Sequence, residues 1–170
     1  DCAVLYRTNA QSRLFEERFI ASNIPYKIVG GVNFYSRKEV KDMLSYLKTI
    51  ANGQDDLAVR RIINVPKRGI GATSITKVAI YAAEHEMNFY SALCEAAEIP
   101  GLGKAAAKIE PFVLFVQSMK AKSQLKPVSE LLQEIIETTG YVRELEAEGT
   151  DEAEARIENI DELISKAVDY

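Results

Sequence analysis

The stretch Val65-Pro66-Lys67-Arg68-Gly69-Ile70-Gly71 is the most informative part of this chain, and a second stretch, Ile99-Pro100-Gly101-Leu102-Gly103-Lys104, is built in the same way. Each places an apolar residue between two glycines, close to a proline and to cations, with helix-forming sequence on both sides. Glycine allows positive φ and a close approach of the backbone, and the apolar residue can point into the packing between two helices. The two stretches therefore predict a pair of helical hairpins.

The helix that follows each hairpin is expected to bind an anion at its start. Its first N–H groups have no acceptor within the helix, and the helix dipole favours negative charge there. The alternative is that each glycine pair only ends a helix and that the nearby cations form a solvated face. Two such hairpins suggest a surface that contacts DNA phosphates without reading bases. The residues predicted to make these contacts are Lys67, Arg68, Gly69, Ile70, Gly71 and Thr73, with a second hairpin formed by Gly101, Leu102, Gly103, Lys104 and Lys108.

The net charge of −4 argues weakly against a nucleic-acid partner, but the charge is unevenly distributed. Residues 1–53 carry +3, residues 54–100 carry −1, residues 101–127 carry +4 and residues 128–170 carry −10. Salt screens charges beyond about 8–10 Å, so a phosphate responds to local charge rather than to the total. The acidic last segment therefore hides the basic segments in the sum.

The predicted fold class is mainly α, with a small strand–helix–strand piece at the N-terminus. Residues 2–6 and 25–29 have the pattern of short strands, and the apolar spacing between them predicts a helix that starts near Thr8 or Asn9 and ends near Asn23. From residue 34 onward the sequence predicts only helices. Their expected ranges are 37–52, 55–63, 73–86, 88–97, 104–109, 111–122, 127–140 and 151–170, with a solvated acidic stretch from 144 to 154.

Two strands are too little sheet to be stable alone, so this piece is expected to belong to a larger α/β sheet. The chain also begins at Asp1 without an initiator Met, which suggests an excised part of a larger protein. Gly30-Gly31 is the best boundary. We therefore expect residues 1–33 to be part of one domain and residues 34–170 to be a helical domain.

A further candidate site follows the first predicted strand, where Arg7, Thr8 and Asn9 open a helix. Ligands collect at the carboxyl ends of strands in α/β sheets, and a helix start offers backbone N–H groups beside the Arg and Asn side chains. This pattern indicates phosphate contact. The alternative is a capped helix with an incidental arginine.

Four stretches in order resemble motifs of the UvrD/PcrA-type superfamily 1 ATP-dependent DNA helicases. These stretches are Ala3-Val-Leu-Tyr-Arg-Thr-Asn-Ala-Gln-Ser-Arg13, Pro25-Tyr-Lys-Ile-Val-Gly-Gly-Val-Asn-Phe-Tyr-Ser-Arg-Lys-Glu-Val-Lys-Asp42, Asn64-Val-Pro-Lys-Arg-Gly-Ile-Gly71 and Arg156-Ile-Glu-Asn-Ile-Asp-Glu-Leu163. Together they span nearly the whole chain. The order of four motifs is far more specific than any one of them.

The resemblance implies that residues 1–33 are a slice of the RecA-like 2A motor subdomain and that residues 34–170 are most of the helical 2B subdomain. It implies 3′–5′ unwinding of DNA in repair or replication, in the bacterial cytoplasm at the nucleoid. By resemblance, Arg7, Thr8 and Asn9 lie on the single-strand track, and the Gly69-Ile70-Gly71 hairpin touches the duplex. Gly30, Gly31 and Tyr35 would then lie at the hinge of 2B.

The chain lacks the Gly-x-x-x-x-Gly-Lys-Ser/Thr phosphate loop and the Asp-Glu metal motif, so we assign no catalytic residue, cofactor or metal ligand to it. ATP and Mg would serve the parent enzyme, and this piece alone should be inactive. Cys2 and Cys94 have no disulfide or metal spacing, and no apolar run predicts a membrane partner. Two other functions stay open: a stand-alone helix-hairpin-helix DNA-repair module, and a protein-interaction or autoinhibitory domain.

Overall fold

The computed structural model describes residues 2–168, and every regular element in this range is a helix. The elements are η1 (Asn9–Gln11), α1 (Ser12–Ala21), η2 (Phe34–Ser36), α2 (Lys38–Ala51), α3 (Asp56–Ile62), α4 (Ala72–Glu84), α5 (Phe89–Cys94), η3 (Gly103–Ala105), α6 (Ala106–Ser123), α7 (Val128–Thr139), α8 (Tyr141–Glu148) and α9 (Asp151–Ala167), where η marks a 3-10 helix. The mainly helical fold class is thereby confirmed. The predicted end of the last helix at 169–170 lies outside the described residues.

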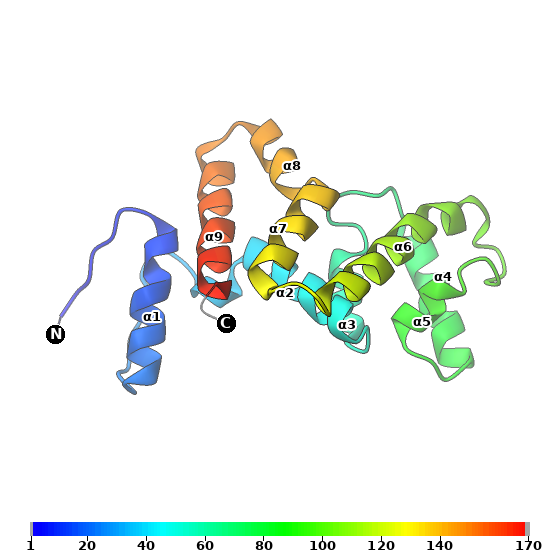
Figure 1. The fold of residues 1–170 in the computed structure, drawn as a ribbon, viewed down its shortest axis with the longest axis horizontal. Coiled ribbons are helices and arrows are strands. Elements are labelled where there is room, and N and C mark those ends of the chain that lie inside the picture. The colour runs from blue at the N-terminus through cyan, green and yellow to red at the C-terminus, as the bar shows by residue number, and fades with distance from the viewer. Residues whose placement is uncertain (1, 169–170) are drawn as a thin grey trace.

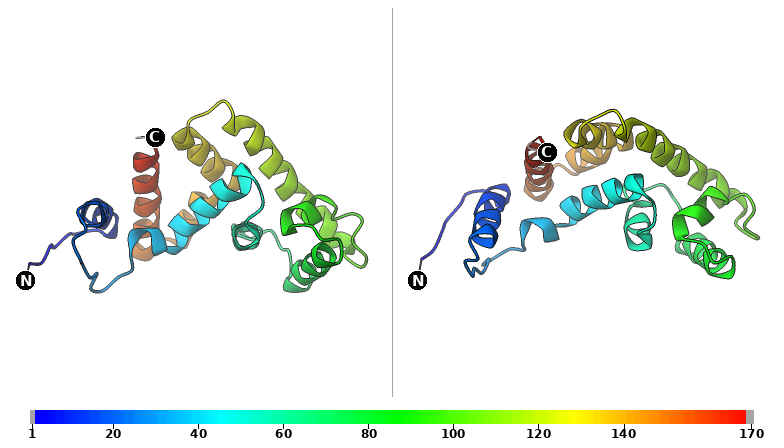
Figure 2. Two further views of the ribbon diagram at one scale, coloured as in Figure 1. Left: turned by 90° about the horizontal axis from the view of Figure 1, so that it is seen from below. Right: turned by 60° about the horizontal axis from the view of Figure 1, so that its bottom comes forward.

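The molecule is elongated, with α1 at one end and α4 and α5 at the other (Figure 1). In the turned views the helices form an arch, in which α2 and α3 run along one side and α6, α7 and α9 along the other (Figure 2). The helix α2 is the centre of the fold, because it packs against α3, α6, α7 and α9. None of the helices from residue 2 to residue 168 is long and apolar enough to cross a membrane.

The core forms because α2 presents apolar side chains at helical spacing. Val40, Met43, Tyr46 and Ile50 are at most 1% exposed and join a continuous apolar cluster that runs from Phe34 to the C-terminal helix. Burial of each such side chain contributes about 1.5–3 kcal/mol to folding. The predicted stripe on this helix is therefore the face that organises the domain.

Helix starts and stops follow local chemistry at most of the predicted positions. The Asp55 carboxylate caps α3 by accepting a hydrogen bond from the Ala58 N–H at 3.0 Å. Pro127 is the N-cap of α7, and Gly140, at φ +71°, ends this helix in the left-handed conformation. The Thr150 hydroxyl caps α9 by accepting from the Ala153 N–H at 3.1 Å.

One predicted boundary in the helical region was wrong, and one helix was not predicted. The ranges 104–109 and 111–122 form one helix, α6, with Pro111 inside it. Pro111 is the sixth residue of α6, so the helix lacks one backbone hydrogen bond there, and Ile109 and Phe112 are buried on both sides of it. No helix was predicted for residues 141–148, where α8 forms around the buried residues Tyr141 and Leu145. The acidic side chains from Glu144 to Glu154 are exposed, as expected for a solvated stretch.

The strand–helix–strand prediction is wrong in its strands. Residues 2–6 and 25–29 form no strand, and only the helix between them is present as α1. A strand needs a neighbour for its backbone N–H and C=O groups, and neither segment has one in the described chain. Their apolar side chains stay in solvent, with Leu5 95% exposed and Val29 87% exposed.

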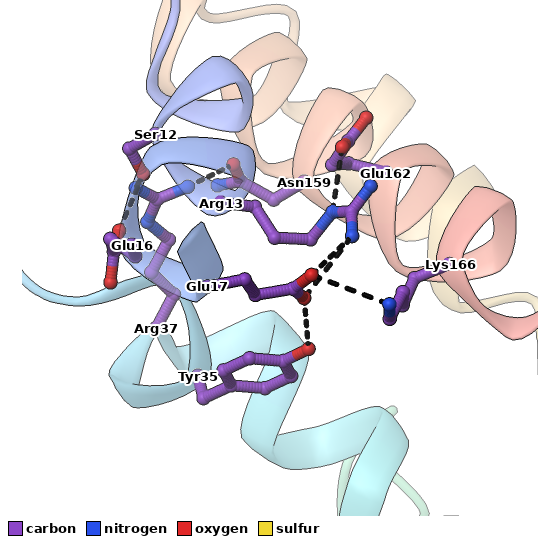
Figure 3. A network of polar contacts seen from close by, with 9 residues as sticks. All are labelled: Ser12, Arg13, Glu16, Glu17, Tyr35, Arg37, Asn159, Glu162 and Lys166. Atoms are coloured by element: carbon purple, nitrogen blue, oxygen red, sulfur yellow. Dashed lines mark hydrogen bonds and ion pairs between the residues drawn. The ribbon is translucent and has the colours of Figure 1, made fainter. Parts of the chain in front are cut away.

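Polar contacts attach the N-terminal segment to the rest of the fold (Figure 3). Arg13 of α1 donates from Nε to Glu162 of α9 at 2.7 Å and also pairs with Glu17 at 3.1 Å. Glu17 in turn pairs with Lys166 at 3.3 Å and accepts a hydrogen bond from the Tyr35 hydroxyl at 2.7 Å. The junction between α1, η2 and α9 is therefore held by charge and hydrogen bonding more than by apolar burial.

A second set of buried contacts at this junction is centred on Arg37. Its guanidinium donates to the Asn159 carbonyl oxygen Oδ1 at 2.7 Å and to the Ser12 hydroxyl at 2.6 Å. The Glu16 carboxylate accepts from the Ser12 hydroxyl at 2.7 Å and from the Phe34 N–H at 3.1 Å. Because these groups are all buried, each of them needs its partner to avoid a desolvation cost.

Candidate nucleic-acid interface

The first hairpin connects α3 to α4, and its shape is set by one asparagine and one glycine. The Asn64 Oδ1 atom accepts from the Arg68 N–H at 2.8 Å and from the Ile70 N–H at 3.4 Å, while its Nδ2 donates to the Ile70 carbonyl at 3.1 Å. Gly69 has φ +68°, which L-residues with a side chain rarely adopt. Ile70 is 2% exposed, as predicted for the apolar residue of the turn.

Arg68 points into the protein and not toward solvent. Its Nη1 donates to the carbonyl oxygens of Ile62 at 2.8 Å, Ile63 at 3.1 Å and Pro66 at 3.3 Å. The guanidinium carbon lies 5.1 Å from the centroid of the Phe112 ring. Arg68 therefore satisfies the carbonyls at the end of α3 and holds the hairpin in shape.

The start of α4 is the part of this hairpin that faces solvent. Gly71 is the N-cap residue, and no side chain caps the helix. The N–H groups of Ala72 and Thr73 lie in the first turn, where helical geometry supplies no acceptor, and both residues are exposed. Lys67 is exposed on the same loop. This arrangement offers two backbone donors and one exposed cation to an anion.

The second hairpin connects α5 to η3 and α6 and has the same design. Gly101 and Gly103 both have positive φ, at +72° and +53°, and Leu102 between them is 5% exposed. Lys104 is exposed at the start of η3, and no side chain caps this element. The predicted burial of the middle residue is confirmed at both hairpins.

The structure brings the two hairpins together through two lysines. The Lys108 Nζ atom, on α6, donates to the carbonyl oxygen of Gly69 at 3.1 Å. The Lys77 Nζ atom, on α4, donates to the carbonyl oxygen of Gly101. Each helix that follows one hairpin thus bonds to the other hairpin, and both hairpins lie at the end of the molecule opposite to α1 (Figure 1).

The predicted single-strand residues lie at that opposite end. Thr8 is the N-cap of η1, and the Gln11 side chain accepts from the Arg7 N–H at 3.0 Å and from the Thr8 N–H at 3.4 Å. Arg7 and Asn9 are exposed. They line an open cleft of about 290 Å³ whose facing wall, on α9, carries the carboxylates of Asp151, Glu154 and Glu158.

The predicted hinge residues follow α1. Gly30 has φ +81°, and Gly31 lies next to the side chains of Ile28 and Asn9. Tyr35 reaches back to Glu17 (Figure 3). Burial would raise the pKa of Glu17, but hydrogen bonds from Tyr35, Arg13 and Lys166 outweigh it and hold the pKa below its usual value.

Sequence reasoning missed three residues of the hairpin region. Asn64 carries a readable signal, since asparagine side chains commonly bond nearby backbone groups in turns. Tyr46 and Lys77 carry none, because their partners lie 19 and 24 residues away in the chain. Their roles depend on how the helices pack.

Comparisons with known proteins identify the family of this chain. The family model described as the UvrD-like helicase C-terminal domain matches residues 1–170. The ATP-dependent DNA helicase PcrA of Staphylococcus aureus is 46% identical over 100% of this chain, and that of Staphylococcus epidermidis is 44% identical over the same length. The chain spans 23% of the length of these relatives. The chain therefore belongs to the UvrD-like helicase C-terminal domain family.

Proposed function

We propose that this chain is the duplex-holding part of an ATP-dependent 3′–5′ DNA helicase. The observation that carries the proposal is the uncapped, exposed start of α4 beside Lys67. Backbone N–H groups and a lysine recognise phosphate without reading bases, which suits an enzyme that must act on any sequence. The second hairpin, with Lys104, adds a similar contact close by.

The proposed layout is a partial 2A motor segment over residues 1–33 and a 2B-like domain over residues 34–170. The apolar cluster supports this division, because it begins at Phe34 and includes no residue before it. The polar junction of Figure 3 would then lie at the boundary, with Gly30, Gly31 and Tyr35 as the hinge. Motion there would swing the hairpins, at the far end, through the largest arc.

We place single-strand DNA near Arg7, Thr8 and Asn9. The distance between the two ends of the molecule suits a junction whose duplex and single strand lie apart (Figure 1). The carboxylates of α9 would repel phosphates inside the cleft, so the strand would approach Arg7 from its outer side. The parent enzyme would act in DNA repair or replication in the bacterial cytoplasm, with a protein partner on the 2B-like helices as a further role.

ATP and Mg do not fit the residues of this chain. The sequence has no phosphate loop, and the described side chains contain no group of three or more His, Cys, Asp or Glu that could hold a metal ion. We therefore assign the hydrolysis of ATP to the parent enzyme and derive no step of it here. The contribution of this chain is to hold DNA while a motor moves it.

Binding of a fluorescently labelled single-strand/duplex junction, measured by anisotropy at low and moderate salt, tests the proposal. The affinity of the 170-residue chain should fall steeply with salt, because phosphate contacts release counterions. Lys67→Glu should weaken binding, whereas Lys41→Glu, at an exposed lysine on α2 outside both hairpins, should not. Circular dichroism would check that both variants fold.

Binding that is independent of salt, or equal losses in the two variants, would contradict the phosphate contact. The absence of binding by a folded chain would instead favour a regulatory or protein-interaction role for these helices.

A further inference from the structure

The bonds of Lys77 and Lys108 are reciprocal. Each lysine lies on the helix that follows one hairpin, and each donates to the first glycine of the other hairpin. Both glycines have positive φ, and each ammonium group lies close against its glycine. A Cβ atom at Gly69 would be 3.3 Å from the Lys108 Nζ, and one at Gly101 would be 3.1 Å from the Lys77 Nζ.

These lysines are not used in ion pairs. No salt bridge of either is found among residues 2–168, although several glutamates are exposed nearby in the sequence. Hydrogen bonds between an ammonium group and a carbonyl oxygen are charge-assisted and stronger than neutral ones. The helices α4 and α6 each pack against α5, so the two lysines add a direct link between elements that otherwise share a neighbour.

We infer that Lys77 and Lys108 are positioning residues that brace the two hairpins into a single phosphate-binding unit. This inference rests on the proposed function, because it assigns how the spacing of the duplex contacts is fixed. The phosphates of a duplex have a set separation. Two hairpins already held at a matching separation lose little conformational entropy when they bind the duplex. Two unlinked hairpins must be ordered on binding, which weakens their affinity.

The inference differs from the simpler role of a lysine that contacts a phosphate. Loss of one phosphate-contacting lysine lowers the slope of log K against log salt by about 0.9. Loss of a brace removes the lysine charge and also weakens the contacts of the hairpin that it holds. The slope should therefore fall by clearly more than this amount, and affinity at moderate salt should fall about tenfold or more.

The first arm of the test needs no DNA. Backbone amide chemical shifts are compared between the 170-residue chain and its Lys77→Met and Lys108→Met variants. Lys108→Met should shift the amides of Gly69 and Ile70 in the first hairpin, and Lys77→Met should shift those of Gly101 and Leu102 in the second. Unchanged shifts across the hairpins would overturn the brace.

The second arm measures the salt slope for duplex binding by anisotropy in the same variants. Lys104→Met serves as the charge-loss comparator, with an expected slope change of about 0.9, and Lys41→Met, outside both hairpins, serves as the control with no change. Lys108→Arg keeps a donor within reach of the carbonyl and should restore most of the affinity. If Lys77→Met and Lys108→Met changed the slope only as much as Lys104→Met, both lysines would act as simple phosphate contacts, and the inference would be overturned.

The two arms separate this inference from the proposed function. Cross-hairpin shifts in a chain that binds no duplex would overturn the proposed function and would support the brace. Duplex binding with no cross-hairpin shifts would support the proposed function and would overturn the brace.

Discussion

The Arg68 Nη2 atom donates a hydrogen bond to the Tyr46 hydroxyl oxygen at 2.7 Å, and the same hydroxyl donates to the carbonyl oxygen of Val65 at 2.6 Å. Tyr46 is fully buried on α2, so this relay ties the first hairpin to the central helix. Burial raises the pKa of Tyr46, and the phenol therefore stays protonated and able to donate at neutral pH. The conformation of the hairpin depends on a core residue 19 positions before it.

Arg68→Met should destabilise the domain by about 2–4 kcal/mol, because three carbonyl oxygens and one hydroxyl each lose a hydrogen-bond donor. Urea unfolding followed by circular dichroism measures the cost. Arg68→Lys should not restore it, since one ammonium group cannot reproduce the planar fork of donors. If the Arg68→Met variant were fully stable but bound DNA more weakly, Arg68 would contact phosphate, as the sequence predicted, and would not hold the hairpin in shape.

Gly69→Ala and Gly71→Ala form a matched pair within one hairpin. Gly69 has φ +68° and lies against Lys108, so alanine should cost about 1–2 kcal/mol in the free energy of unfolding. Gly71 has φ −73°, and a Cβ atom there would meet nothing within 4 Å. Alanine is a poorer N-cap than glycine but reduces the entropy of the unfolded chain, so the two effects nearly cancel and the cost should be less than about 0.5 kcal/mol. Equal costs in thermal or urea unfolding would contradict the left-handed assignment of Gly69.

Features set by neighbours in the chain could be predicted from the sequence. Asp55 caps α3, Gly140 ends α7, and Ile70 and Leu102 are buried between their glycines. Each of these depends on a turn or a helix end, where the chemistry of a few consecutive residues decides the conformation. The helical ranges were therefore largely right before the packing was known.

Features set by distant partners could not be predicted. The direction of Arg68 depends on Tyr46 and Phe112, which only the packing of α2, α6 and the hairpin brings together. The strands expected at 2–6 and 25–29 need a neighbouring sheet edge, and their local pattern cannot supply one. The helix α8 was also not predicted, because only two of its residues, Tyr141 and Leu145, are buried among exposed acidic ones.

Glu17→Gln should weaken the α1–α9 junction in a pH-dependent way. The folded state holds the pKa of Glu17 below its unfolded value, so the charged carboxylate contributes stability above the unfolded pKa. That contribution is lost as the pH falls through the lowered folded pKa. Urea midpoints of wild type and variant should differ most at neutral pH and converge below about pH 4.

Glu110→Gln is the control for this acid effect, because Glu110 is exposed on α6, away from the junction. Its urea midpoint should follow that of the wild type at every pH. A constant gap between wild type and Glu17→Gln down to low pH would show that the glutamine change acts through packing rather than through charge.

Tyr141→Phe tests how α8 is held to the core. The Tyr141 hydroxyl donates to the Asp42 Oδ2 atom at 2.7 Å, while Arg61 donates to Oδ1 of the same carboxylate at 2.6 Å. Asp42 is 1% exposed, so loss of one donor leaves a buried carboxylate oxygen unpaired and should cost about 1.5–3 kcal/mol. Thermal unfolding measures the loss, with Tyr81→Phe, at an exposed hydrogen bond to Glu95, as the matched control. Equal small losses in both variants would mean that apolar contacts of Leu145, and not the buried carboxylate, fix α8 against α2.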